Sequence, residues 1–109
     1  MFNGVKAKFG DKEVVIPPLS LGQLRNGALE LLKKHDELVE KNQFMESALI
    51  RGEVIALALT RNYPEMTVDL VFENLDLSNV NELWRTVIGL SGFSPGEKEA
   101  ARTTETPGT

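Results

Sequence analysis

The sequence predicts a mainly helical fold, in which a short N-terminal β-hairpin is followed by a four-helix bundle-like domain. Three observations lead to this fold class: residues 4–16 have the alternation of paired strands, residues 21–90 carry apolar side chains at helical spacing, and residues 94–109 contain no apolar residue larger than alanine and proline. We expect a single domain over 1–93, with the hairpin at about 4–16. The tail, 94–109, cannot bury enough surface to offset its ordering entropy and is expected to be disordered.

The hairpin is predicted from two short runs at the N-terminus. Val5, Ala7 and Phe9 alternate with lysines, which is the pattern of a strand with one buried face. The turn signal 10–12 separates them from the β-branched run 14–16. A two-stranded hairpin is marginal in water by itself, so it must pack on the helices or join strands from another chain.

A strand-to-helix switch follows. Pro17-Pro18 ends the second strand, because proline has no N–H to donate to a strand ladder. Ser20 and Gln23 have the spacing of a capping box, and Leu19 and Leu24 have that of a hydrophobic staple. The first helix is therefore predicted to begin directly after Ser20.

This first helix is predicted to run without interruption to about Lys41. Gly22 and Gly27 would each weaken it by up to about 1 kcal/mol relative to alanine, and we expect them to admit another backbone. At three-four spacing its apolar stripe consists of Leu21, Leu24, Ala28, Leu31, His35 and Leu38.

Asn42 is expected to bend or break the chain before a second helix over about 43–61. In this helix Ala48, Gly52 and Ala56 recur every four positions. Such small residues form a flat ridge, which we expect to pack against the first helix in antiparallel orientation.

Two shorter helices complete the prediction. Thr67 is expected to cap a helix reaching about Leu75, with Val68, Val71, Phe72 and Leu75 facing inward. Asn79 and Glu82 resemble a capping box that opens the last helix, which ends near Leu90 with Gly92 as its stop signal.

Composition excludes several classes of function. The chain has 109 residues, no cysteine and a net charge of −4. Without cysteine there are no disulfides or thiolate metal sites, and an acidic chain argues against nucleic-acid binding. The longest stretch with few charges, 54–60, is far too short to span a membrane, and residues 1–13 lack the apolar run of a secretory signal.

No catalytic arrangement is predicted. His35, the single histidine, lies on the apolar stripe and is expected to be packed there. The carboxylates lie three or four apart, as on an ordinary helix surface, and no phosphate-binding loop is present. We therefore expect no enzymatic activity, no metal and no cofactor. Arg51 and Arg61 are expected on a solvated face, and Tyr63 either anchors its loop or contacts a partner.

Three segments together resemble the tail assembly chaperones of long-tailed bacteriophages and prophages. They are 16–25 (IPPLSLGQLR), 55–67 (ending ALTRNYPEMT) and 75–93 (LDLSNVNELWRTVIGLSGF). The resemblance implies a protein that binds the tape measure protein, keeps it soluble and helps to recruit tail tube protein. It also implies that the protein acts in the bacterial host cytoplasm and is not part of the mature virion.

The expected contact surface is where the first two helices meet. We expect either partner binding or self-association there, and the alternative is that these residues simply form the core. A homo-oligomer could also form through the hairpin. Other interpretations are a different phage tail morphogenesis or structural protein, and a small helical DNA-binding regulator, which the charge disfavours. The predicted contact residues are Leu24, Leu31, Leu38, Met45, Leu49 and Tyr63.

Overall fold

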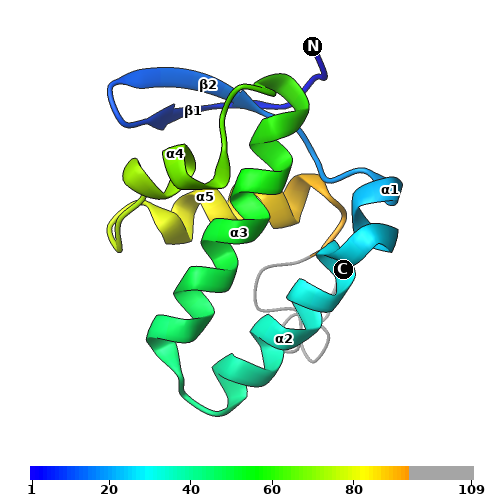
Figure 1. Ribbon diagram of the computed structural model, residues 1–109, viewed down its shortest axis with the longest axis vertical. Helices are drawn as coiled ribbons and strands as arrows, with labels where there is room; N and C mark the ends of the chain where they lie inside the picture. Colours follow the sequence, from blue (N-terminus) through cyan, green and yellow to red (C-terminus); the bar gives the residue numbers. More distant parts are fainter. Residues whose placement is uncertain (94–109) are drawn as a thin grey trace, which may run out of the picture.

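A computed structural model describes residues 1–93 and confirms the mainly helical fold with an N-terminal hairpin and four helical segments, the first of which is divided into α1, η1 and α2 (Figure 1). The expected tail, 94–109, lies outside the described residues. The elements are β1 (Val5–Phe9), β2 (Lys12–Ile16), α1 (Leu21–Gln23), η1 (Leu24–Ala28), α2 (Leu29–Glu40), α3 (Phe44–Asn62), α4 (Val68–Glu73) and α5 (Val80–Leu90).

The hairpin forms as predicted and packs on the helices. β1 and β2 are antiparallel, and their register pairs Val5 with Ile16 and Phe9 with Lys12. Gly10 takes a φ of 64° in the turn, a conformation that glycine adopts without steric cost. Phe9, Val14 and Ile16 are buried in the common core, which supplies the support that an isolated hairpin lacks.

Helix α3 is the centre of the fold. It packs against α2, α4, α5 and β2, and Figure 1 shows α2 descending beside it, α5 crossing behind it and the hairpin lying over its C-terminal end. Residues one position apart on a helix point about 100° apart, so consecutive buried residues mean burial on nearly every side. The residues of α3 with no exposed surface include Val54, Ile55, Ala56, Ala58 and Leu59.

The predicted start of the first helix is confirmed. The Ser20 hydroxyl accepts from the Gln23 backbone N–H at 3.0 Å, and the Gln23 side chain accepts from the Ser20 N–H at 3.1 Å. This is the reciprocal capping box. The Gln23 side-chain amide also donates to the carbonyl of Leu57 at 2.7 Å, so the cap ties the start of the helix to α3.

The prediction of one uninterrupted first helix is wrong. Within η1, Asn26 leaves the helical region and Gly27 adopts a φ of 134°. The Leu29 N–H then donates to Leu24, five residues earlier instead of four, so the turn contains one extra residue. The predicted stripe is buried or half-buried from Leu24 to Leu38, but Leu21, also predicted to face inward, is 84% exposed.

The glycines of this segment do not admit another backbone. A Cβ built at Gly27 would meet no atom within 4 Å, and one at Gly22 would meet only the Ser20 hydroxyl at 3.7 Å. Gly27 is required by its positive φ, which L side chains rarely adopt. The expectation of a close backbone approach is therefore wrong at both positions.

Two helices end in the same backbone motif. At the end of α2, Asn42 has a φ of 58°, and the N–H of Gln43 donates to Leu38 at 2.9 Å. At the end of α5, Gly92 has a φ of 93°, and the N–H of Phe93 donates to Ile88 at 2.9 Å. Both ends have the six-to-one hydrogen bond of a Schellman motif, which confirms Asn42 and Gly92 as stop signals.

The caps of the two short helices differ. Thr67 caps α4 as predicted, since its hydroxyl accepts from the Leu70 N–H at 3.2 Å. The capping box predicted at Asn79 is wrong, because its side chain makes no cap hydrogen bond to α5. Instead Asp76 Oδ1 accepts from the backbone N–H groups of Ser78 and Asn79 at 2.9 and 3.0 Å, and this turn leads into the helix.

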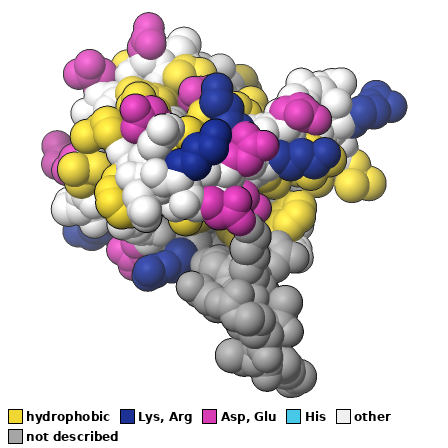
Figure 2. Space-filling view, turned by 90° about the horizontal axis from the view of Figure 1, so that it is seen from below, with side chains coloured by type: hydrophobic (Ala, Val, Ile, Leu, Met, Phe, Trp, Pro, Cys, Tyr) yellow, Lys and Arg dark blue, Asp and Glu magenta, His cyan; other side chains and the backbone are white. Residues whose placement is uncertain are grey.

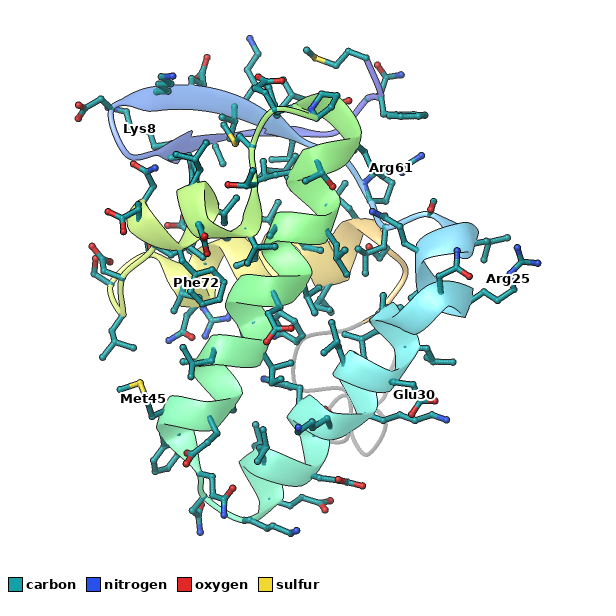
Figure 3. The ribbon with its side chains drawn as sticks, viewed as in Figure 1. Lys8, Arg25, Glu30, Met45, Arg61 and Phe72 are labelled. Atoms are coloured by element: carbon teal, nitrogen blue, oxygen red, sulfur yellow. The ribbon has the colours of Figure 1, made fainter. Side chains whose placement is uncertain are left out.

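Helix α3 packs against α2 as predicted, but Gly52 of the small-residue ridge has a different neighbour. A Cβ at Gly52 would lie 2.8 Å from Cζ of Phe72 and 3.4 Å from Cδ1 of Leu75. Gly52 therefore accommodates α4 and the residues after it, and not the first helix. The ring of Phe72 is drawn against α3 in Figure 3. Val68, predicted to face inward, is 48% exposed.

The break at Gly27 can be tested with two alanine substitutions. Gly27→Ala should lower the free energy of unfolding by about 1 kcal/mol or more, because alanine is strained at positive φ. Gly89→Ala is the matched control: Gly89 lies inside α5 with open space around it, so alanine should raise the free energy of unfolding by about 0.5–1 kcal/mol. Urea unfolding measures both. If Gly27→Ala were stabilising, the first helix would be continuous in solution.

Candidate functional site

The single histidine belongs to a polar cluster that joins three helices. His35 of α2 is buried, and its Nε2 accepts from Nε of Arg51 at 3.0 Å. The same guanidinium donates to Asn81 of α5 at 3.0 Å and to the Ser47 hydroxyl at 3.3 Å. The imidazole ring lies 4.4 Å, centroid to centroid, from the ring of Trp84. The cluster therefore connects α2, α3 and α5.

Burial and the Arg51 guanidinium favour the neutral form of His35 by lowering its pKa. Because Nε2 accepts from Arg51, the ring proton belongs on Nδ1, whose nearest polar neighbour is Asp36 Oδ1 at 3.5 Å. Burial first, and then the Arg51 guanidinium, lower the pKa of His35, and Asp36 opposes the shift only in part. This arrangement explains the histidine by packing, as expected from its place on the stripe.

A second polar cluster fastens the hairpin to the end of α3. The Asn62 side-chain amide donates to the carbonyls of Phe2 and Val15 at 3.0 and 3.1 Å, and its oxygen accepts from the Phe2 N–H at 2.6 Å. The Tyr63 hydroxyl accepts from the Val15 N–H at 2.8 Å. Arg61 donates to the Pro18 carbonyl, and its guanidinium lies 3.9 Å from the centroid of the Phe2 ring.

These contacts answer the open question about Tyr63 and correct the expectation for the two arginines. Tyr63 anchors its loop to β2, so its hydroxyl is engaged within the chain. Arg51 and Arg61 are half-buried and hydrogen-bonded, not solvated. Asn62 and Tyr63 occupy the outer backbone groups of Val15, so the β2 edge is covered at this residue. No strand of residues 1–93 pairs with the outer edge of β1.

One concave feature of residues 1–93 is an open groove across the exposed side of α3, between α2 and α4. Its volume is about 520 Å³. Apolar side chains from all three helices line it, and carboxylates from α3 and α4 stand among them. We call this feature the groove, and it is lined by Leu31, Glu53, Leu57, Val68, Asp69, Phe72 and Glu73.

Local sequence explains why the groove forms. Gly52 lets the Phe72 ring approach α3 closely, which places α4 as one wall. Thr67 fixes the first turn of α4, so Val68 begins the helix at the rim of the groove. On the opposite side, Leu31 follows the break at Gly27 and packs half-buried against the core.

An exposed apolar strip continues the groove along α3. Met45 is 58% exposed and Leu49 is 47% exposed. Residues four apart are neighbours on a helix surface, so Met45 and Leu49 lead directly to Glu53 and Leu57. Met45 projects from α3 into solvent in Figure 3. Figure 2, which looks from the end of the α2–α3 turn, shows apolar side chains exposed among charged ones.

The structure divides the predicted contact residues into two groups. Leu24, Leu31 and Leu38 are half-buried and pack against the core, as the alternative interpretation held. Met45 and Leu49 are exposed, and Leu31 reaches the groove. Sequence reasoning missed Leu57, Val68 and Phe72 as a shared surface, because the residues come from elements far apart in the chain. The only sequence signal for this surface was that these apolar residues lie in or beside the apolar stripes of two predicted helices.

Other classes of site find no support in the described part of the chain. No three histidine or carboxylate side chains of residues 1–93 gather where they could hold a metal ion. No helix among them has the length and apolar character to cross a bilayer. Comparison of the chain with protein-family models, curated proteins and solved structures finds no match. The groove is therefore the candidate site on its geometry alone.

The cluster around His35 predicts a dependence of stability on pH. Because the pKa of His35 is lowered in the folded state, the unfolded chain takes up a proton first, near its ordinary value of about 6.5. The free energy of unfolding should fall as the pH drops below this value, and level off once the folded protein is also protonated. Urea unfolding between pH 7.5 and 5 measures the slope.

The control for this prediction is His35→Gln. Glutamine can still accept from Arg51 but does not titrate, so the variant should lose less stability over the same pH range. The chain has one histidine, so no other imidazole contributes. Equal pH slopes in the two proteins would contradict the role assigned to His35.

Proposed function

We propose that this protein is a phage tail assembly chaperone, which binds the tape measure protein through apolar helical surfaces and assists assembly of the tail tube. The observation that supports the proposal is the groove with its exposed strip, an apolar surface open along a helix. The choice of the tape measure protein as the client comes from the family resemblance in 16–25, 55–67 and 75–93. The chain performs no catalysis in this account.

The shape of the groove suits a helix better than a small molecule. Small-molecule sites are enclosed and have a few polar groups converging on the ligand. Here the polar groups are carboxylates on exposed residues, Glu53, Asp69 and Glu73. An amphipathic helix can place its apolar face on such a surface, with anchors three and four residues apart. From Met45 to Leu57, α3 offers about 18 Å, which matches roughly three helical turns.

The energetics permit binding that a tail tube subunit can reverse. A tape measure protein exposes apolar helical stripes until tube subunits cover them. Covering about 400 Å² of apolar surface is worth up to about 10 kcal/mol at 25 cal/mol per Å², and association costs several kcal/mol or more. The net free energy left after this cost corresponds to moderate affinity. Such binding would keep the tape measure protein soluble and still allow its transfer to tail tube subunits.

The proposal predicts the effect of a charge placed on the strip. Leu49→Asp combined with Met45→Asp should reduce copurification with a co-expressed tape measure protein at least about tenfold, because a buried unpaired carboxylate is costly. Both side chains are exposed, so the free energy of unfolding should change by no more than about 0.5 kcal/mol per site.

The matched control is Leu77→Asp. Leu77 is 66% exposed and lies between α4 and α5, outside the groove. This variant should retain the client. Equal copurification by the strip and control variants would contradict the site, and failure of the wild-type protein to bind the tape measure protein would contradict the function.

A further inference from the structure

We propose that the groove is built for an amphipathic helix that carries lysine or arginine residues along the borders of its apolar face. This inference rests on the proposed function and adds the chemistry of the client segment. Two observations support it: the groove is an open apolar surface, and three carboxylates lie within it that have no cationic partner among residues 1–93.

The apolar part of the groove sets the form of the occupant. Leu31, Leu57, Val68 and Phe72 come from three helices and face one open space. The exposed strip of Met45 and Leu49 extends this surface along α3. An apolar surface several turns long, interrupted on α3 only by Glu53, is matched by side chains recurring at three-four spacing on a partner helix.

The carboxylates set the charge of the occupant. Glu53 lies on α3, and Asp69 and Glu73 lie on α4, so acidic groups come from two elements that border the groove. Among residues 1–93, no lysine or arginine lines the groove. Within residues 1–93 the Lys33 ammonium lies 4.0 Å from the Glu30 carboxylate, and no ion pair involves the groove carboxylates.

The acidic residue at position 69 stabilises α4, but the one at position 73 does not. Asp69 is in the first turn of α4, where a negative charge complements the helix dipole. Glu73 is the last residue of the same helix, where a negative charge is unfavourable. Asp69 and Glu73 are also like charges four residues apart, which repel each other. A cationic partner helix would relieve this repulsion and pair with all three carboxylates.

The negative charge of the groove also favours a basic-bordered helix over an acidic-bordered helix or a second copy of this chain. A helix with acidic borders would meet like charges across the interface, which suppresses a wrong partner. A second copy of this chain, with a net charge of −4, would bring further negative charge to the groove. A basic-bordered helix is therefore the occupant that the surface favours.

The test uses the full chain and two synthetic peptides of about 20 residues. Both carry leucine at the same three-four spacing, with lysine at the border positions of one and glutamate at those of the other. Fluorescence anisotropy at low salt should give at least about tenfold tighter binding of the lysine peptide, as expected for three exposed ion pairs. This preference should shrink as salt screens the charges.

Two charge variants locate the effect. Glu53→Gln, Asp69→Asn and Glu73→Gln together should remove the preference for the lysine peptide. The control set Asp11→Asn, Glu13→Gln and Glu82→Gln changes the net charge equally but lies outside the groove, and should retain it. Loss of the preference in both sets would assign it to net charge alone and overturn the inference.

The remaining outcomes separate the inference from the proposed function. Equal binding of the two peptides, or unchanged tape measure copurification by the groove charge variant, would overturn the basic-bordered helix and leave the chaperone proposal standing. Failure of both peptides and of the tape measure protein to bind would overturn both. Self-association through the groove, seen by sedimentation and abolished by Leu49→Asp, would assign the groove to a second copy and overturn the inference.

Discussion

The fold depends on the burial of α3. Val54, Ile55 and Leu59 of this helix are fully covered by the elements packed around it. α2, α4, α5 and β2 each cover a part of it, and the coverage is incomplete between α2 and α4, where the groove lies. The candidate site is therefore the side of the central helix that residues 1–93 leave open, and not a feature added to the fold.

Two polar clusters attach the surrounding elements to α3 and restrict how they can move. Arg51 binds His35 of α2 and Asn81 of α5, while Asn62 and Tyr63 hold β2 at the other end of the helix. Buried polar groups are costly unless they are hydrogen-bonded, so these contacts favour one arrangement of α2, α5 and the hairpin. The Arg51 cluster thus fixes α2, one border of the groove, while α4, the other border, is placed by Phe72 packing on Gly52.

Local signals were sufficient to predict the elements, and tertiary contacts decided the rest. The capping box at Ser20 and the stop signal at Gly92 act within a few residues, so sequence spacing reveals them. The break at Gly27 was not predictable, because glycine is compatible with both a continuous and a broken helix. Of the residues that line the groove, only Leu31 was among the predicted contact residues. The other apolar lining residues were missed because α4 meets α3 through Phe72 packing on Gly52, a contact between segments distant in sequence.

The central claim is that the open side of α3 is where the client helix binds. Amide chemical shifts of the isotope-labelled protein, titrated with a tape measure fragment, test it most directly. The account predicts that the largest changes fall on 49–57 and 68–73, which border the groove, while the hairpin is little affected. Changes concentrated on Val5–Phe9, the strand with the open edge, would contradict the account and indicate binding by strand addition.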